Sequence, residues 1–147
     1  MRIFAPVLAV LLASQAHAAC APGQETFLSC TFQNGRKAVD VCVQGSTASY
    51  RFGPTGGAAE LALTVPISAL DYTPWPGIGS NIWERVIFTN GGVSYEVYGS
   101  VSKAVDTKGQ PAEIYGGIDV FEKGSLLASL ACDTGSVDFP WTDALSQ

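Results

Sequence analysis

The stretch ETFLSCTF (25–32), QNG (33–35) and RKAVDVCV (36–43) decides the fold of this chain. Its two longer runs are rich in apolar, β-branched and aromatic residues, and Asn34-Gly35 lies between them. Asn-Gly at such a position predicts a hairpin, because both central residues of a type I′ turn need positive φ. We therefore expect two antiparallel strands joined by a two-residue loop.

A two-residue loop also sets the register of this hairpin. Phe32 then faces Lys37, Cys30 faces Val39, and Phe27 faces Cys42. The predicted core face carries Leu28, Cys30, Phe32, Val39 and Val41. Cys42 points to the opposite face, so Cys30 and Cys42 cannot be joined by a disulfide. A register shifted by one residue would reverse this conclusion.

The rest of the chain continues in the same style, with short apolar runs separated by turn residues. Predicted strands cover 25–32, 36–43, 49–53, 60–65, 82–89, 93–101, 113–121 and 125–132. Pro66–Asn81 is predicted to be irregular, and the tail 133–147 has room for at most one helical turn. We expect one all-β domain, residues 19–147, in which an antiparallel meander of about eight strands closes as a barrel or folds as a sandwich.

The N-terminus has the order of a secretory signal peptide. Met1-Arg2 is followed by the apolar run IFAPVLAVLLA (3–13) and by the A-x-A site Ala16-His17-Ala18. This run is too short to span a bilayer. We expect cleavage after Ala18 and a soluble product in the periplasm or outside the cell. His17 stands where a lipoprotein needs a leucine-like residue, which disfavours a lipid anchor on Cys20.

Four cysteines follow the leader: Cys20, Cys30, Cys42 and Cys132. An even number in an exported chain predicts two disulfides, and the absence of a C-x-x-C pair argues against a metal site. The hairpin register favours Cys20–Cys42, which would tie down the N-terminal arm. It then leaves Cys30–Cys132, which would link the first and last strands.

The amino-acid composition limits the catalytic mechanisms and the partners that this chain could use. Cleavage removes the one histidine, and the seven basic and thirteen acidic residues that remain give a net charge of −6. The absence of histidine excludes Ser-His-Asp and Cys-His mechanisms and zinc sites that use histidine. Asp71, Glu84, Glu96, Glu113 and Asp119 show no spacing that demands a catalytic pair. We expect no enzyme and no cofactor. The acidic charge disfavours nucleic acid and anionic membranes, and favours a basic partner.

Aromatic residues are the remaining candidates for binding. Tyr72 and Trp75 lie in the Pro/Gly-rich segment, where binding residues are common. They could contact a sugar or a protein partner, or could equally belong to the core. We expect Trp83 and Trp141 to close the ends of the core.

Two resemblances follow from these residues. The motifs FLSC (27–30), NG (34–35), VC (41–42), YRFG (50–53) and FTNG (88–91) resemble a family of small exported bacterial proteins without an assigned activity. This resemblance spans most of the mature chain and implies the fold and export, but no function.

The layout is also similar to the periplasmic and membrane-bound inhibitors of c-type lysozyme, which are small antiparallel barrels. Their Ser-Gly-x-x-Tyr loop corresponds to Gly91, Gly92, Val93, Ser94 and Tyr95, with Gly91 in place of the serine. Lys123-Gly124 and Cys132 correspond to their Lys-Gly turn and terminal cysteine. In that family the loop enters the enzyme's cleft, so the missing serine weakens the correspondence.

The sequence thus predicts a non-catalytic binding protein of the bacterial envelope. The leading hypothesis is inhibition of a basic cell-wall hydrolase such as lysozyme, with the Gly91–Tyr95 hairpin and the Tyr72–Trp75 loop as contact surfaces. Tyr95→Ala and Trp75→Ala would then weaken binding without unfolding the domain. The alternatives are binding of peptidoglycan or another cell-wall glycan through the same aromatic residues, or a structural protein without a dedicated ligand.

Overall fold

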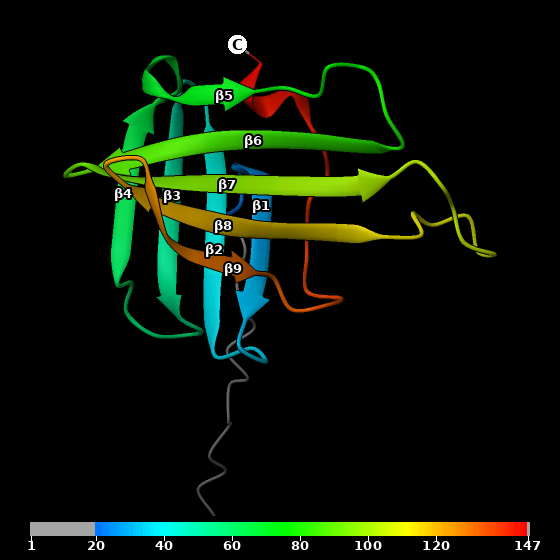
Figure 1. The fold of residues 1–147 in the computed structure, drawn as a ribbon, viewed down its shortest axis with the longest axis horizontal. Helices are drawn as coiled ribbons and strands as arrows, with labels where there is room; N and C mark the ends of the chain where they lie inside the picture. Colours follow the sequence, from blue (N-terminus) through cyan, green and yellow to red (C-terminus); the bar gives the residue numbers. More distant parts are fainter. Residues whose placement is uncertain (1–19, 147) are drawn as a thin grey trace, which may run out of the picture.

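The computed structural model describes residues 20–146, which form two antiparallel sheets packed face to face (Figure 1). Sheet A contains β1 (Glu25–Phe32), β2 (Lys37–Gln44), β3 (Thr47–Pro54) and β4 (Leu61–Pro66). Sheet B contains β5 (Asp71–Thr73), β6 (Asn81–Asn90), β7 (Val93–Ser102), β8 (Ile114–Glu122) and β9 (Ser125–Ala131). Two 3-10 turns complete the fold, Ile67–Ala69 and Asp143–Leu145. The predicted signal peptide, 1–18, lies outside the described residues.

Each sheet is a meander in which consecutive strands are neighbours. The strands of sheet B cross those of sheet A instead of running alongside them, the orthogonal arrangement of sheet packing (Figure 1). The sandwich prediction is confirmed, and the barrel alternative is wrong. The turn at Ile67–Ala69 carries the chain from one sheet to the other, so β4 and β5 do not pair. No helix within residues 20–146 is long and apolar enough to cross a membrane.

All eight predicted strands are present, with ends within two residues of those expected. The sequence analysis missed β5, whose three residues lie in the segment predicted to be irregular. β5 pairs with β6 through Tyr72 and Val86. A strand of three residues followed by Pro74 is too short to show an alternating pattern.

The β1–β2 hairpin confirms most of the predicted register. Phe32 pairs with Lys37 and Cys30 with Val39, and Asn34 and Gly35 both have positive φ. The predicted two-residue loop is wrong, because four residues, 33–36, separate the strands and Gln33 also has positive φ. The pairing predicted for Phe27 is wrong, because a β-bulge between Thr26 and Leu28 places Thr26 opposite Cys42. The extra residue lets Phe27 and Leu28 both be buried, although they are neighbours in sequence.

Both predicted disulfides are confirmed, Cys20–Cys42 and Cys30–Cys132. Cys30 lies on the inner face of sheet A, so its bond to Cys132 ties sheet A to the end of β9. Disulfides of this kind indicate an oxidising, extracytoplasmic environment.

The core lies between the inner faces of the two sheets. Sheet A contributes Leu28, Phe32, Val39 and Val41, and sheet B contributes Val86, Phe88, Val97 and Ile118. The C-terminal segment adds Phe139, Ala144 and Leu145. Phe139 enters the space above Gly99, where a Cβ would overlap its ring.

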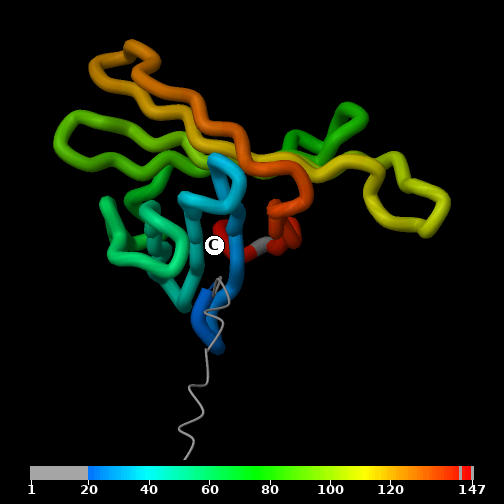
Figure 2. Tube along the Cα trace, turned by 90° about the horizontal axis from the view of Figure 1, so that it is seen from below, coloured from blue at the N-terminus to red at the C-terminus, as the bar shows by residue number. Residues whose placement is uncertain are grey.

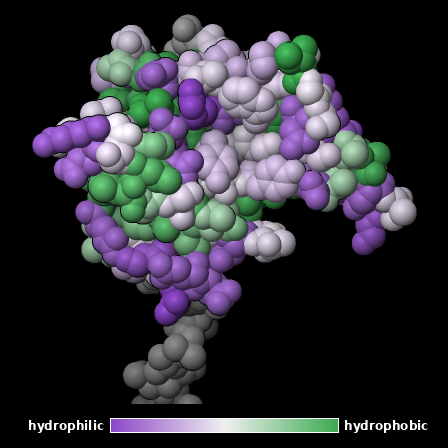
Figure 3. Space-filling view, viewed as in Figure 1, coloured by the Kyte–Doolittle hydropathy of each residue, from purple (hydrophilic) through white to green (hydrophobic). Residues whose placement is uncertain are grey.

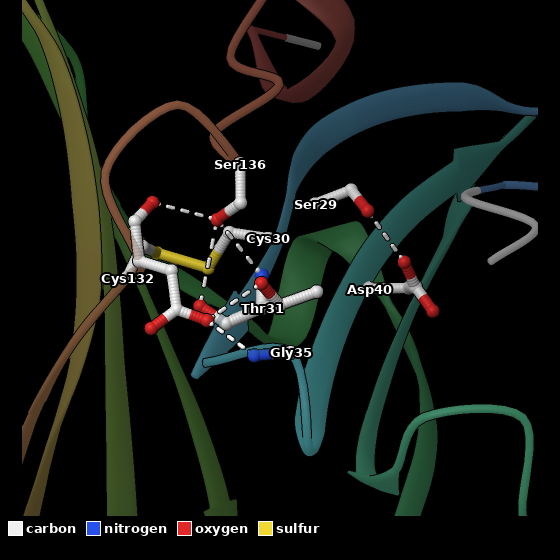
Figure 4. Close-up of a disulfide and its surroundings, with 8 residues drawn as sticks. Ser29, Cys30, Thr31, Gly35, Asp40, Cys132 and Ser136 are labelled. Atoms are coloured by element: carbon white, nitrogen blue, oxygen red, sulfur yellow. Dashed lines mark hydrogen bonds between the residues drawn. A yellow bond between two sulfur atoms is a disulfide. The ribbon is translucent and has the colours of Figure 1, made fainter. Parts of the chain in front are cut away.

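The C-terminal segment is also hydrogen-bonded to sheet A. Asp138 exchanges two backbone hydrogen bonds with Ser29, of 3.0 and 2.8 Å, at the β1 edge. The Asp133 carboxylate accepts hydrogen bonds from the Thr31 hydroxyl (2.8 Å) and from two amides of the β1–β2 turn, Asn34 and Gly35. Thr31 and Gly35 lie beside the Cys30–Cys132 disulfide (Figure 4). These hydrogen bonds, that from Thr31 first, lower the pKa of Asp133.

Candidate functional site

Tyr72 is partly buried and points toward the core. Its hydroxyl donates a 2.6 Å hydrogen bond to Glu84, whose side chain is buried on β6. The ring packs against the core cluster. Tyr72 therefore has a packing role in this structure.

Trp75 instead belongs to a small aromatic cluster at the end of sheet B. Its indole meets that of Trp141 edge to face, with ring centroids 6.0 Å apart, and the Lys103 ammonium lies 4.3 Å from its centroid. Trp141 is 42% exposed, so the expectation that it closes the core is wrong. Phe139 and Leu145 are the buried residues on either side of it, and Trp141 itself has a φ of +49°.

The Gly91–Tyr95 hairpin has the predicted turn. β6 ends at Asn90, β7 begins at Val93, and Gly91 and Gly92 have φ of 59° and 83°. Ser94 lies on the outer face of sheet B, but Tyr95 lies on the inner face. The Tyr95 ring packs against buried Tyr50, with centroids 5.5 Å apart. Tyr95 thus belongs to the edge of the core.

The structure does not bring the two predicted contact surfaces together. The Gly91-Gly92 turn is at one end of β6 and β7, and residues 74–80 are at the other end (Figure 1). A strand of ten residues spans roughly 30 Å. A single partner that contacts both surfaces would have to span about this length of the sheet.

The outer face of sheet B is turned away from sheet A (Figure 1). Along β6, Glu84, Val86 and Phe88 point inward and are buried, so Trp83, Arg85 and Ile87 point outward. The hairpins that carry this face extend beyond sheet A at one end (Figure 2). In Figure 3, which looks onto this face, strongly apolar atoms gather toward the β8–β9 hairpin, and paler ones cover the middle of the sheet.

Two exposed aromatic residues lie in one row across this face. Trp83 on β6 pairs with Ser100 on β7, and Ser100 pairs with Tyr115 on β8. Trp83 is 36% exposed and Tyr115 is 41% exposed, so the expectation that Trp83 closes the core is also wrong. Their backbones are two strand spacings apart, roughly 10 Å.

Hydrogen bonds hold the Tyr115 ring in place. The Asn81 amide on β6 donates to the Tyr115 hydroxyl (3.1 Å), and this hydroxyl donates to Glu113 (2.8 Å). The same amide also donates to Ser100 (3.3 Å). Since Asn81 is two strands away from Tyr115, the ring must lie across β7. The row therefore offers a fixed aromatic ring bordered by amide, hydroxyl and carboxylate groups.

Tyr98 extends this row toward the middle of the sheet. Its hydroxyl lies so close to Gly117 that a Cβ at that position would overlap it. Burial first, and the charge of Asp119 second, raise the pKa of Tyr98. Beside it Arg85 lies 3.6 Å from Glu96, and Asp119 accepts a hydrogen bond from Ser129.

The sequence analysis missed Tyr115 and misjudged Trp83. The alternation within each predicted strand was enough to place Trp83 on the face opposite Val86 and Phe88, and Tyr115 on the face opposite Ile118. It could not show that this face stays uncovered. That depends on where sheet A and the C-terminal segment pack.

No group of three or more His, Cys, Asp or Glu side chains within residues 20–146 is arranged to hold a metal ion. Comparison of the chain with protein-family models, curated proteins and solved structures found no match.

Proposed function

We propose that this chain is an exported, non-catalytic binding protein that holds a glycan chain of the bacterial envelope on the outer face of sheet B. The observation that carries the proposal is the row of Trp83, Ser100 and Tyr115, in which two exposed rings lie on an uncovered sheet face. The Tyr115 ring is held there by Asn81 and Glu113.

The chemistry of this row suits a sugar better than a purely apolar ligand. The C–H faces of a sugar ring pack on aromatic side chains, and its hydroxyls need hydrogen-bonding partners nearby. Asn81, Ser100 and Glu113 supply such partners next to the rings. Because Tyr115 is already ordered, binding costs little side-chain entropy. Because the Tyr115 ring lies across β7, the two rings can contact one sugar or two neighbouring sugars of the same chain.

The compartment is consistent with this ligand. The predicted signal peptide and the two disulfides favour the envelope or the space beyond it, where cell-wall glycans are abundant. A ligand present at high local concentration needs only modest affinity from a shallow surface.

The first test is co-sedimentation of the oxidised mature protein with peptidoglycan, chitin and cellulose. Trp83→Ala and Tyr115→Ala should each weaken binding about tenfold, since a well-packed aromatic contact is worth about 1–1.5 kcal/mol. Leu126→Ala is the matched control, because Leu126 is exposed at the far end of sheet B. It should change the affinity less than twofold.

Wild-type protein that sediments with none of these polymers would contradict the proposal. An equal loss of binding in Leu126→Ala would also contradict it, because the row would then have no special role. Circular dichroism and thermal unfolding of each variant establish that the fold is retained.

A second candidate function is inhibition of a basic hydrolase. The observation in its favour is the Gly91-Gly92 turn, which is exposed at a free end of sheet B with open space beside both glycines. Titration into cell-wall lysis by c-, g- and i-type lysozymes tests it. Inhibition at near-stoichiometric ratio would support this function, and unimpaired lysis by all three classes would rule it out for lysozymes.

A further inference from the structure

The charges on the outer face of sheet B are strongly unequal. Strand alternation places three carboxylates and one cation on this face: Asp71, Glu96 and Asp119, with Arg85. Glu113, just before β8, is a fourth carboxylate, held at this face by its hydrogen bond from Tyr115. Arg85 lies between Thr73 and Glu96, so its charge is directed toward the β5–β7 side. Of these five charged residues, the two that lie on the β8 side, Glu113 and Asp119, are both carboxylates.

Glu113 is the carboxylate nearest to the aromatic row. Its Oε2 accepts the hydrogen bond from the Tyr115 hydroxyl, which fixes the carboxylate beside the exposed ring. Glu113 is itself exposed, and no ion pair among residues 20–146 involves it. A cation placed here would meet a carboxylate and the face of an aromatic ring together, a combination that favours ammonium groups.

A hollow of about 470 Å³ adjoins this position. β9 ends opposite Gly117, so the β8 edge is open beyond it, and the chain from Cys132 to Val137 forms the other wall. Glu113 and Asp133 line the hollow, and none of its lining residues is basic. Hydrogen bonds from Thr31 and from the β1–β2 turn lower the pKa of Asp133. The hollow has room for a substituent of the sugar bound to the row.

We infer that the glycan held by this face is cationic, an amino sugar polymer whose free ammonium group contacts both the Glu113 carboxylate and the face of the Tyr115 ring. The inference rests on the proposed function, since it concerns the same row of aromatic residues. It is favoured over a neutral glycan by the excess of carboxylates on this face. The overall charge of −6 in the mature chain acts in the same direction, because it attracts a cationic polymer at long range.

The test compares two oligosaccharides of equal length and linkage. One is a chitin oligomer, which carries neutral acetamido groups, and the other is its deacetylated glucosamine counterpart, measured by calorimetry at a pH where the amines are protonated. The wild-type protein should bind the glucosamine oligomer at least fivefold more tightly. Glu113→Gln should bring the ratio of the two affinities close to one, whatever its effect on the affinity for the chitin oligomer.

Glu122→Gln is the matched control. It removes one negative charge from the far end of β8, and the preference should survive. Equal affinity of wild-type protein for both oligomers, or a preference that survives Glu113→Gln, would overturn the inference and leave glycan binding intact. Binding of neither oligomer, combined with tight binding of a basic lysozyme, would overturn both, and would assign the acidic face to a protein partner.

Discussion

Tyr95 and Tyr115 have opposite roles because of the face of sheet B on which each lies. Tyr95 is on the inner face of β7, where its ring packs against Tyr50 and Tyr50 packs against Phe88. Tyr115 is on the outer face of β8, where its ring is exposed and its hydroxyl is hydrogen-bonded. The same side chain thus contributes to stability at one position and is available to a ligand at the other.

Tyr95→Ala should therefore lower the free energy of unfolding by about 2 kcal/mol, through lost burial and the lost ring contact. Tyr95→Phe keeps the ring and should stay within about 0.5 kcal/mol of wild type. Ser94→Ala, on the outer face next to it, is the surface control. Urea unfolding of the three variants measures this. If Tyr95→Ala unfolds with the same free energy as wild type, Tyr95 is not a core residue, and the hairpin could again be a contact surface.

At the scale of elements, the C-terminal segment behaves as a third layer at one end of the sandwich. Asp138 pairs with the β1 edge, Phe139 occupies the space above Gly99 on β7, and Leu145 reaches the core. Trp141 lies between Phe139 and Leu145 in the sequence, and its ring packs edge to face against Trp75. The packing of this segment therefore requires that residue 99 has no Cβ, because the Phe139 ring occupies that space.

Gly99→Ala should displace Phe139 and destabilise the domain by about 1–3 kcal/mol, the usual cost of overpacking. Phe139→Ala opens the same space, so adding Gly99→Ala to that background should cost much less. Unfolding free energies of the two single variants and the double variant give the coupling. If the two effects simply add, Gly99 and Phe139 do not share this space.

At the scale of the whole molecule, two disulfides constrain a small domain in different ways. Cys20–Cys42 is separated by 22 residues and holds the N-terminal arm on sheet A. Cys30–Cys132 is separated by 102 residues and joins the inner face of sheet A to the strand that ends sheet B. The second bond is the one that limits how far the two sheets can separate.

Replacing each cysteine pair by alanine tests this difference. Chain entropy predicts losses of about 3 kcal/mol for Cys20–Cys42 and about 5 kcal/mol for Cys30–Cys132, because the longer loop gains more freedom when opened. Guanidinium unfolding of the two variants under identical conditions shows which of them loses more free energy of unfolding. A larger loss for the Cys20–Cys42 variant would contradict the assignment of Cys30–Cys132 as the dominant constraint.

Local features of this protein could be predicted from the sequence because they depend on neighbouring residues. Asn34-Gly35 and Gly91-Gly92 supply positive φ at their turns, and the alternation of strand residues identifies Val39 and Val41 as core. The hairpin register separated Cys30 from Cys42, and of the remaining pairings the prediction favoured the two that the structure has. The bulge at Phe27 escaped prediction, because it depends on core packing and not on the turn.

The sequence alone determined an all-β chain of meandering hairpins with two disulfides, since each of these follows from short-range geometry. Only the tertiary structure decided between sandwich and barrel, and which sheet face stays open. Trp83 and Tyr115 became a candidate site for that reason: strand parity puts them on one face, but exposure depends on where residues far along the chain pack. Such long-range contacts have no signature in the spacing of residues along the sequence.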